Sequence, residues 1–475
     1  MNRKLLLLSI GIVFLLTSCT LAPKYRRSEA PIPGDWPSGA AYRDITTSSG
    51  APAPPELGWQ EFFADERLQR LIERALNNNR DLRVAALNVE RARALYGIQR
   101  AELFPVVNAV GSLSKERIPA DSAGFPVGVS GAGDLTIEQS SVNLGISSWE
   151  IDFFGRIRSL KKQALEEYLA TEQARRSAQI LLVSTVANAY LTLAADRQAL
   201  NLGQSTQETQ QAAYDLIKRR YEVGLANELD LRQAQTQVDT ARGDVARFIQ
   251  QAAQDENALN LLLGSPAPKE LLPVDLNSVI SPREISPGMS SEVLLRRPDI
   301  LQAENLLKAA HANIGVVRAA FFPRVTLTTT VGTASDGVSG LFKSGSGAWS
   351  YAPQIILPIF DARTWSAFRE SKAEREIALA QYEKAIQVAF REVSDALAVK
   401  GTVTQQIAAQ QSLVNAVAET YRLSNARYTK GIDSYLSVLD AQRSLYAAQQ
   451  GLISLRLAGV SNLVTVYRVL GGGDK

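Results

Sequence analysis

The chain has 475 residues and carries 51 Lys and Arg against 48 Asp and Glu. This balance argues against a nucleic-acid partner, which requires a strongly basic patch. With one cysteine, one histidine and two methionines, the chain cannot form an intrachain disulfide and offers no cluster of soft or imidazole metal ligands.

The first 18 residues predict a secretory signal peptide. Arg3 and Lys4 precede an apolar run from Leu5 to Leu16, which is too short to span a bilayer as a helix. The segment Leu16-Thr17-Ser18-Cys19 follows and resembles a bacterial lipobox. It implies cleavage before Cys19 and attachment of N-acyl and S-diacylglycerol lipid to that residue. Thr20 is not the Asp of an inner-membrane retention signal, which favours the outer membrane as the destination.

Residues 19–60 are rich in Pro, Ser, Gly and Ala and are interpreted as a lipid-anchored N-terminal arm. A short helix is predicted over Asp65–Asn77. A longer helix is predicted over Asp81–Phe104, with Asp81 as its N-cap and Pro105 ending it.

Two strand pairs are predicted, at about 105–150 and 323–358, each joined by a Gly/Ser-rich loop. Apolar and small polar residues alternate along them, which is the period of a strand with two different faces. The apolar positions are Val142, Leu144, Ile146, Val325, Leu327 and Val331, and the polar ones are Ser141, Asn143, Thr326, Thr328 and Thr330. Aromatic residues at the strand ends are typical of a girdle at a membrane interface.

Each strand pair is followed by a stretch that favours a very long helix. Residues 156–218 and 362–430 contain no proline, and about 60 helical residues would reach roughly 90 Å. Shorter helices are predicted at 227–263 and 434–470, after turns at Gly224 and Gly431. A Pro-rich linker, assigned to 265–291, separates the two sets.

The two sets are copies of one unit. Residues 299–325 repeat residues 81–107 at a constant offset, and Tyr221-x-x-Gly224 recurs as Tyr428-x-x-Gly431. The repeat predicts two domains, 61–264 and 292–475. A duplicated helix, hairpin and helix unit suits a symmetric tube better than a pocket enzyme.

About four strands in one chain cannot close a barrel, since a transmembrane barrel needs at least about eight. Past Leu16 we expect no apolar stretch that could cross a membrane as a helix; Leu181–Leu193 comes closest but is interrupted by polar residues. Membrane crossing would therefore use strands. Two chains would give a filled eight-stranded barrel and three a twelve-stranded one with a wet lumen.

Several motifs together resemble the TolC family, in its OprM-like lipoprotein branch, over nearly the whole chain. Besides the lipobox they are Asn79-Arg80-Asp81-Leu82, Phe104-Pro105, Arg296-Arg297-Pro298-Asp299-Ile300, Ala320-Phe321-Phe322-Pro323, Leu357-Pro358-Ile359-Phe360 and Leu439-Asp440-Ala441-Gln442-Arg443. The resemblance implies an α+β membrane protein, a homotrimer whose shared β-barrel in the outer-membrane lipid continues into a long periplasmic α-helical barrel. It further implies the passive exit channel of a tripartite efflux system for drugs or other small molecules. A periplasmic adaptor and an inner-membrane pump, expected to be of the RND type, would complete that system.

The resemblance also places a constriction at the periplasmic turns. It falls on Leu436 and Asp440, one helical turn apart, with Asp230 at the first turn. Ser437 replaces a second acid of the TolC branch, so a double acidic ring is not expected. Bonds that hold the turns are expected from Tyr428, Arg427 and Lys430. The turns at Gly224 and Gly431 are the expected adaptor-docking tips.

Two other classes remain as alternatives, a lipid-anchored hydrolase and a structural periplasmic lipoprotein. No Gly-x-Ser-x-Gly elbow or phosphate loop is present. His311 is interpreted as an ordinary helix residue, because its repeat counterpart is Arg93. We therefore expect no enzyme activity, no catalytic residue and no metal site.

Overall fold

The computed structural model describes residues 20–42, 57–119, 135–283, 285 and 290–472. The chain divides into two units, each described separately below. The sheet unit contains residues 1–28, 90–170 and 304–380, and the turn unit contains residues 29–89, 171–303 and 381–475. Cys19 lies outside the described residues.

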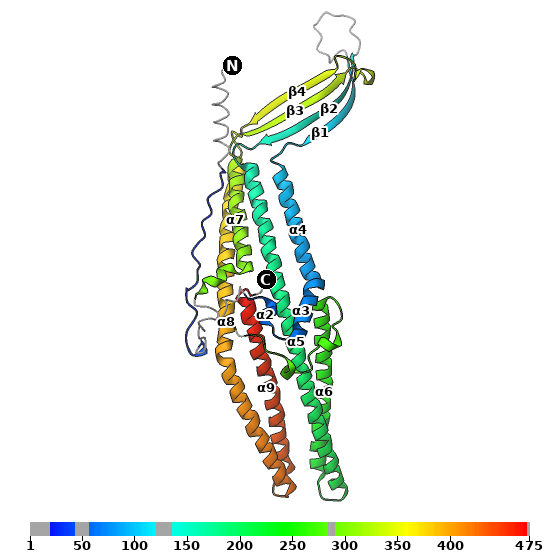
Figure 1. The fold of residues 1–475 in the computed structure, drawn as a ribbon, viewed down its shortest axis with the longest axis vertical. Coiled ribbons are helices and arrows are strands. Elements are labelled where there is room, and N and C mark those ends of the chain that lie inside the picture. Colours follow the sequence, from blue (N-terminus) through cyan, green and yellow to red (C-terminus); the bar gives the residue numbers. More distant parts are fainter. Residues whose placement is uncertain (1–19, 43–56, 120–134, 284, 286–289, 473–475) are drawn as a thin grey trace, which may run out of the picture. The chain divides into compact units, whose positions relative to one another are not determined.

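The described elements occur in a duplicated order (Figure 1). The first set is α4 (Arg80–Ala101), β1 (Val107–Ile118), β2 (Leu135–Ile151), α5 (Arg156–Glu222) and α6 (Glu228–Leu263). The second set is α7 (Pro298–Ala319), β3 (Arg324–Ser335), β4 (Gly347–Ile356), α8 (Ala362–Thr429) and α9 (Tyr435–Val469). The paired helices match closely in length, with 67 residues in α5 and 68 in α8. The predicted repeat of helix, strand pair, long helix and shorter helix is confirmed.

The helix starts differ from the prediction at one position. The amide of Leu82 donates to Asn79 Oδ1 at 2.9 Å, so Asn79 caps α4 and the assignment of Asp81 as the cap is wrong. Asn79 also donates from Nδ2 to the carbonyl of Leu262 at 2.9 Å. One buried amide therefore caps one helix and contacts the end of another, which an exposed carboxylate at position 81 cannot do.

Two short helices, α2 (Trp59–Phe62) and α3 (Glu66–Asn78), pack in the turn unit. The rings of Phe62 and Tyr467 stack with centroids 4.1 Å apart, and both side chains are fully buried. Leu71, Ile72 and Ala75 form the buried face of α3, at the helical spacing of three and four residues.

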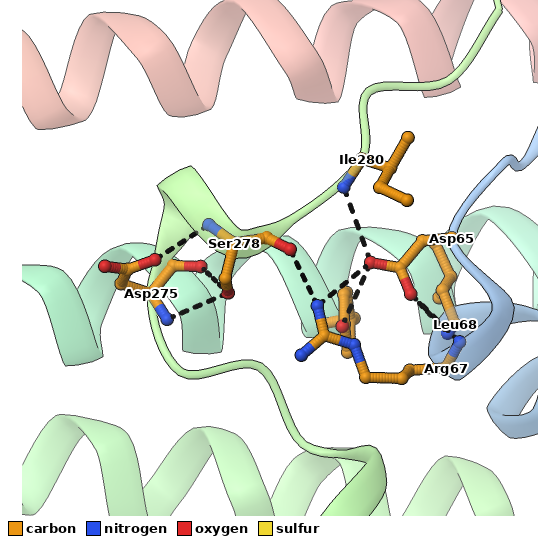
Figure 2. A network of polar contacts seen from close by, with 7 residues as sticks. Asp65, Arg67, Leu68, Asp275, Ser278 and Ile280 are labelled. Carbon is orange, nitrogen blue, oxygen red and sulfur yellow. Dashed lines mark hydrogen bonds and ion pairs between the residues drawn. The ribbon is translucent and has the colours of Figure 1, made fainter.

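Asp65 joins three segments of the turn unit (Figure 2). Its carboxylate accepts from the amides of Arg67 at 2.9 Å and Leu68 at 3.3 Å, which caps α3. It also accepts from the amide of Ile280 at 3.4 Å and from the hydroxyl of Tyr190 at 3.4 Å. Arg67 donates from Nη2 to the carbonyl of Ser278 at 2.7 Å. The proline-rich linker is thereby fastened to α3 and α5.

The four strands form one antiparallel sheet in the order β1-β2-β3-β4. Register pairs Val331 with Leu144 and Trp349, and pairs Thr330 with Gly145 and Ser350. One face thus carries apolar and aromatic residues and the other carries small polar ones, as predicted. We call these the apolar face and the polar face. The outer edges of β1 and β4 have no strand partner among the described residues.

Two described helices, α5 and α9, contain an 18-residue stretch that is long and apolar enough to cross a membrane by composition. The expectation of no such stretch was therefore too strict. The stretch in α5 is 61% buried inside the fold, which is typical of a core helix.

Candidate functional site

The two helix turns are built identically. Gly224 and Gly431 both have φ +74°, the left-handed conformation that only glycine adopts without strain. Gly224 donates to the carbonyl of Tyr221, and Leu225 donates to that of Arg220. Gly431 and Ile432 make the same two bonds in the second copy. This is the Schellman pattern, which satisfies the last carbonyls of a helix. A Cβ at either glycine would meet nothing within 4 Å, so backbone conformation alone requires glycine.

Behind the turns, the two hairpins α5–α6 and α8–α9 share one apolar cluster. Its buried members are Ile217, Ala234, Tyr435, Val438 and Leu439, with Tyr214, Leu231, Tyr421 and Tyr428 packed against them. Burial raises the pKa of Tyr435 to about 12, so this phenol stays neutral at physiological pH. The cluster holds the two turns together within one chain.

The predicted constriction residues lie outside this cluster. Leu436 is 48% exposed, and the Asp440 side chain is 64% exposed. Tyr435, Val438 and Leu439 turn into the cluster, so Leu436 and Asp440 occupy the opposite face of α9. Asp440 has a partner that the sequence interpretation did not include, because Arg443 donates to it at 2.8 Å.

Asp230 is half-buried at the first turn. Its amide donates to Asn227 Oδ1 at 2.8 Å, so Asn227 caps α6. The negative charge of Asp230 contributes to the raised pKa of both Tyr428 and Tyr435, although burial is the larger cause. Asp230 is thus near enough to the other hairpin for its charge to act on both phenols.

The bonds at the turns differ in part from those expected. Arg427 donates to Asp433 from two nitrogens, at 2.5 and 3.1 Å, and this pairing holds the pKa of the Asp433 carboxyl below its ordinary value. Tyr428 packs on Tyr435 with centroids 5.2 Å apart, and Arg220 lies over its ring with Cζ 5.4 Å from the centroid. In the described part of the chain, Lys430 forms a hydrogen bond only through its backbone, from its amide to the carbonyl of Ala426 at 3.2 Å.

Sequence reasoning missed Asp433 and Arg220. The repeat contained a signal for Arg220, since it is the counterpart of Arg427. Asp433 corresponds to Ala226, so the first copy lacks the carboxylate that would pair with Arg220. Arg220 instead contacts the Tyr428 ring of the second hairpin. The contact of Arg220 with Tyr428 therefore reflects the replacement of Asp433 by Ala226 in the first copy.

Residues 20–28 of the N-terminal arm contact α7 in the sheet unit. Arg318 donates to the carbonyl of Leu21 at 3.1 Å, and the hydroxyl of Tyr25 donates to Glu304 at 3.0 Å. Arg27 forms an ion pair with the same buried carboxylate. His311 packs edge-on against Tyr25, and burial lowers its pKa. No group of three or more potential metal ligands occurs among the described residues.

Known proteins that resemble this chain over nearly its whole length are outer membrane efflux proteins and channels. A family model described as "Outer membrane efflux protein" matches residues 71–265 and 289–472. The chain is 48% identical to the probable efflux pump outer membrane protein TtgC of Pseudomonas putida, over 100% of this chain and 96% of TtgC. It is 40% identical to outer membrane protein OprJ of Pseudomonas aeruginosa, over 97% and 94% of the two chains. The open-state MtrE outer membrane channel of Neisseria gonorrhoeae matches with a TM-score of 0.84 at 34% identity, over 96% and 99%.

Proposed function

The chain belongs to the outer membrane efflux protein family, and from this premise we propose that it forms a homotrimeric channel that passively carries small molecules out of the periplasm. It is an efflux channel component and not an enzyme. The observation that carries the proposal is that both family matches coincide with one strand pair and one pair of long helices each.

The sheet supports the trimer. A sheet edge exposed to lipid leaves backbone groups without partners, at a cost of several kcal/mol each. Since β1 and β4 are both open edges in the described chain, neighbouring copies must pair with them. Three copies give twelve strands, which leaves room for an aqueous lumen behind the polar face.

The turns support a closed gate made by Leu436 and Asp440. Two bare carboxylates about 6 Å apart in water repel by roughly 0.7 kcal/mol, so a ring of three would oppose closure by about 2 kcal/mol. Pairing of Asp440 with Arg443 reduces this repulsion. Burying a leucine side chain stabilises by about 1.5–3 kcal/mol. Contact among three Leu436 side chains therefore outweighs the repulsion.

The adaptor is proposed to dock at the turns around Gly224 and Gly431. Apolar residues are exposed there, including Val223, Leu225, Leu229 and Ile432. Isolated exposed apolar residues are normal, but a group at two adjacent turns is typical of a protein-binding surface. An inner-membrane pump of the RND type supplies the energy in this proposal.

The lipid anchor is proposed at Cys19. The described residues that follow Cys19 contact α7, Leu21 through Arg318 and Tyr25 through Glu304. Arg318 lies six residues before the start of β3 in the sequence. Mass spectrometry of membrane-extracted protein should find an acylated Cys19 at the N-terminus. An unmodified N-terminus elsewhere would contradict the anchor. Because strands also hold the protein, Cys19→Ala should impair maturation more than folding.

Function is tested in a Gram-negative strain that lacks its own outer-membrane efflux channels. Expression of this chain with its adaptor and pump should lower the accumulation of a fluorescent efflux dye. The dye should accumulate again when the adaptor is omitted. Equal accumulation with and without the chain would contradict the efflux function.

A further inference from the structure

A β-bulge decides which face of the sheet Glu150 occupies. Register runs from Ile146 opposite Thr329 to Trp149 opposite Leu327, so β2 contains one more residue than β3 over this stretch. Ser148 takes the extra place with φ +52°, and its amide donates to Thr328 Oγ1 at 3.1 Å. Without the bulge, Glu150 would share a face with Val142 and Leu144. With it, Glu150 pairs with Thr326 on the polar face.

Glu150 holds two arginines there. Arg156 donates from Nε and Nη2 to its two oxygens, both at 2.8 Å, and Arg324 Nε lies 2.6 Å from Oε2. The Glu150 side chain is only 9% exposed, whereas Arg324 is 55% exposed. Both carboxylate oxygens are thus occupied, and the triad carries one surplus positive charge.

Glu102 lines a pocket together with Glu150, Arg156 and Arg324. Its negative charge acts on Arg156 and offsets the surplus charge of the triad. A cavity of about 340 Å³ beside the triad is also lined by Asp152 and Asp361. Asp152 is paired with Arg158 at 3.1 Å, and Asp361 with Arg363 at 3.0 Å. Each of these two carboxylates is therefore matched by an arginine other than Arg324. Among the described residues, the Arg324 side chain pairs only with Glu150, through Nε, so its two Nη groups remain as donors.

We propose that Arg324, oriented by Glu150, binds small anions bearing phosphate or carboxylate groups as they pass along the polar face of the sheet. A guanidinium with two parallel N–H groups matches such anions bidentately. This inference rests on the proposed function, because the polar face lines a lumen only in the trimer. Three copies would then form a ring of three Arg324 guanidinium groups, separate from the carboxylates of Asp440.

The test is block of single-trimer current in planar bilayers by inorganic pyrophosphate. Wild type should be blocked, and Arg324→Gln should weaken the block roughly fivefold, because three charges act on the anion together. Arg324→Lys keeps the charge and should retain most of the block. Lys115→Gln is the matched control, because Lys115 pairs with Glu138 on the apolar face and should leave the block unchanged.

The outcomes distinguish a failure of the proposed anion site from a failure of the proposed channel function. If wild type conducts and Arg324→Gln is blocked as strongly as wild type, the anion site is wrong and the channel stands. Equal weakening by Lys115→Gln would also overturn the site, because it would indicate a general charge effect. Absence of any current both in wild type and in Leu436→Ser trimers, whose gate should be open, would contradict the channel itself.

Discussion

At the scale of single residues, the gate depends on side chains that the rest of their own chain leaves uncovered. Leu436 and Asp440 lie on the exposed face of α9, whereas their neighbours Tyr435 and Leu439 are buried in the cluster between the hairpins. The buried set holds the turns together within a chain. The exposed set is available for contact between chains.

Replacing Leu436 with Ser should therefore open the gate. The apolar contact that outweighs carboxylate repulsion would be lost, and the resting conductance of trimers in planar bilayers should rise. Asp440→Ala should mainly lower cation preference, with a smaller effect on closure, because the leucine contact and not the carboxylate ring holds the gate shut. Leu261→Ser, at an exposed position on α6 far along the chain from the turns, is the control. Unchanged conductance and selectivity in both gate variants would place the constriction elsewhere.

A second prediction at this scale concerns Asp65, which is 2% exposed. Asp65→Ala removes the cap of α3, leaves the buried hydroxyl of Tyr190 unpaired and frees the amide of Ile280, at an expected cost of about 2–4 kcal/mol. Asp65→Asn keeps one carboxamide oxygen as an acceptor and should cost less. Thermal unfolding midpoints in detergent should rank wild type above Asn and Asn above Ala. An Ala variant as stable as wild type would show that the network does not fasten the linker.

At the scale of elements, the two faces of the sheet should tolerate charge differently. Leu327 belongs to the apolar face and Thr328 to the polar face. Leu327→Arg should destabilise the membrane-inserted protein by about 2–4 kcal/mol if the side chain faces lipid near mid-depth. Thr328→Arg should be tolerated better. The measurement is the amount of folded trimer recovered from outer membranes, and equal recovery of the two variants would invalidate the face assignment.

Much of the element order was predictable because the signals are local and strong. Period-two alternation identified the strands, and a lack of proline over some 60 residues identified α5 and α8. Predicted helix ends lie within a few residues of those observed, since Asn227 and the glycines of the turns act through local hydrogen bonds.

The bulge at Ser148 and the pairing of Asp65 with Ile280 were not predictable. Both depend on residues far apart in the sequence, such as Thr328 and the linker. At the gate, the sequence placed Leu436 and Asp440 on one face, but the ion pair of Arg427 with Asp433 depends on how the turn folds back.

At the scale of the whole molecule, one chain is an incomplete membrane protein. Its sheet has four strands and two open edges in the described residues, and each edge requires a partner in lipid. The same conclusion follows from the strand count, because closure needs at least about eight strands. Assembly is therefore part of the fold of this protein.

Cross-linking between the two sheet edges tests the shared barrel most directly. Ser112 on β1 and Ser350 on β4 both lie on the polar face, and Cys19, proposed to be acylated, is the chain's sole native cysteine. Ser112→Cys and Ser350→Cys in one chain, treated in membranes with a short bismaleimide, should yield covalent dimers and trimers and nothing larger. Each single variant should stay monomeric under the same treatment. A double variant that gives only monomers, or a ladder that continues beyond the trimer, would contradict a barrel shared by three chains.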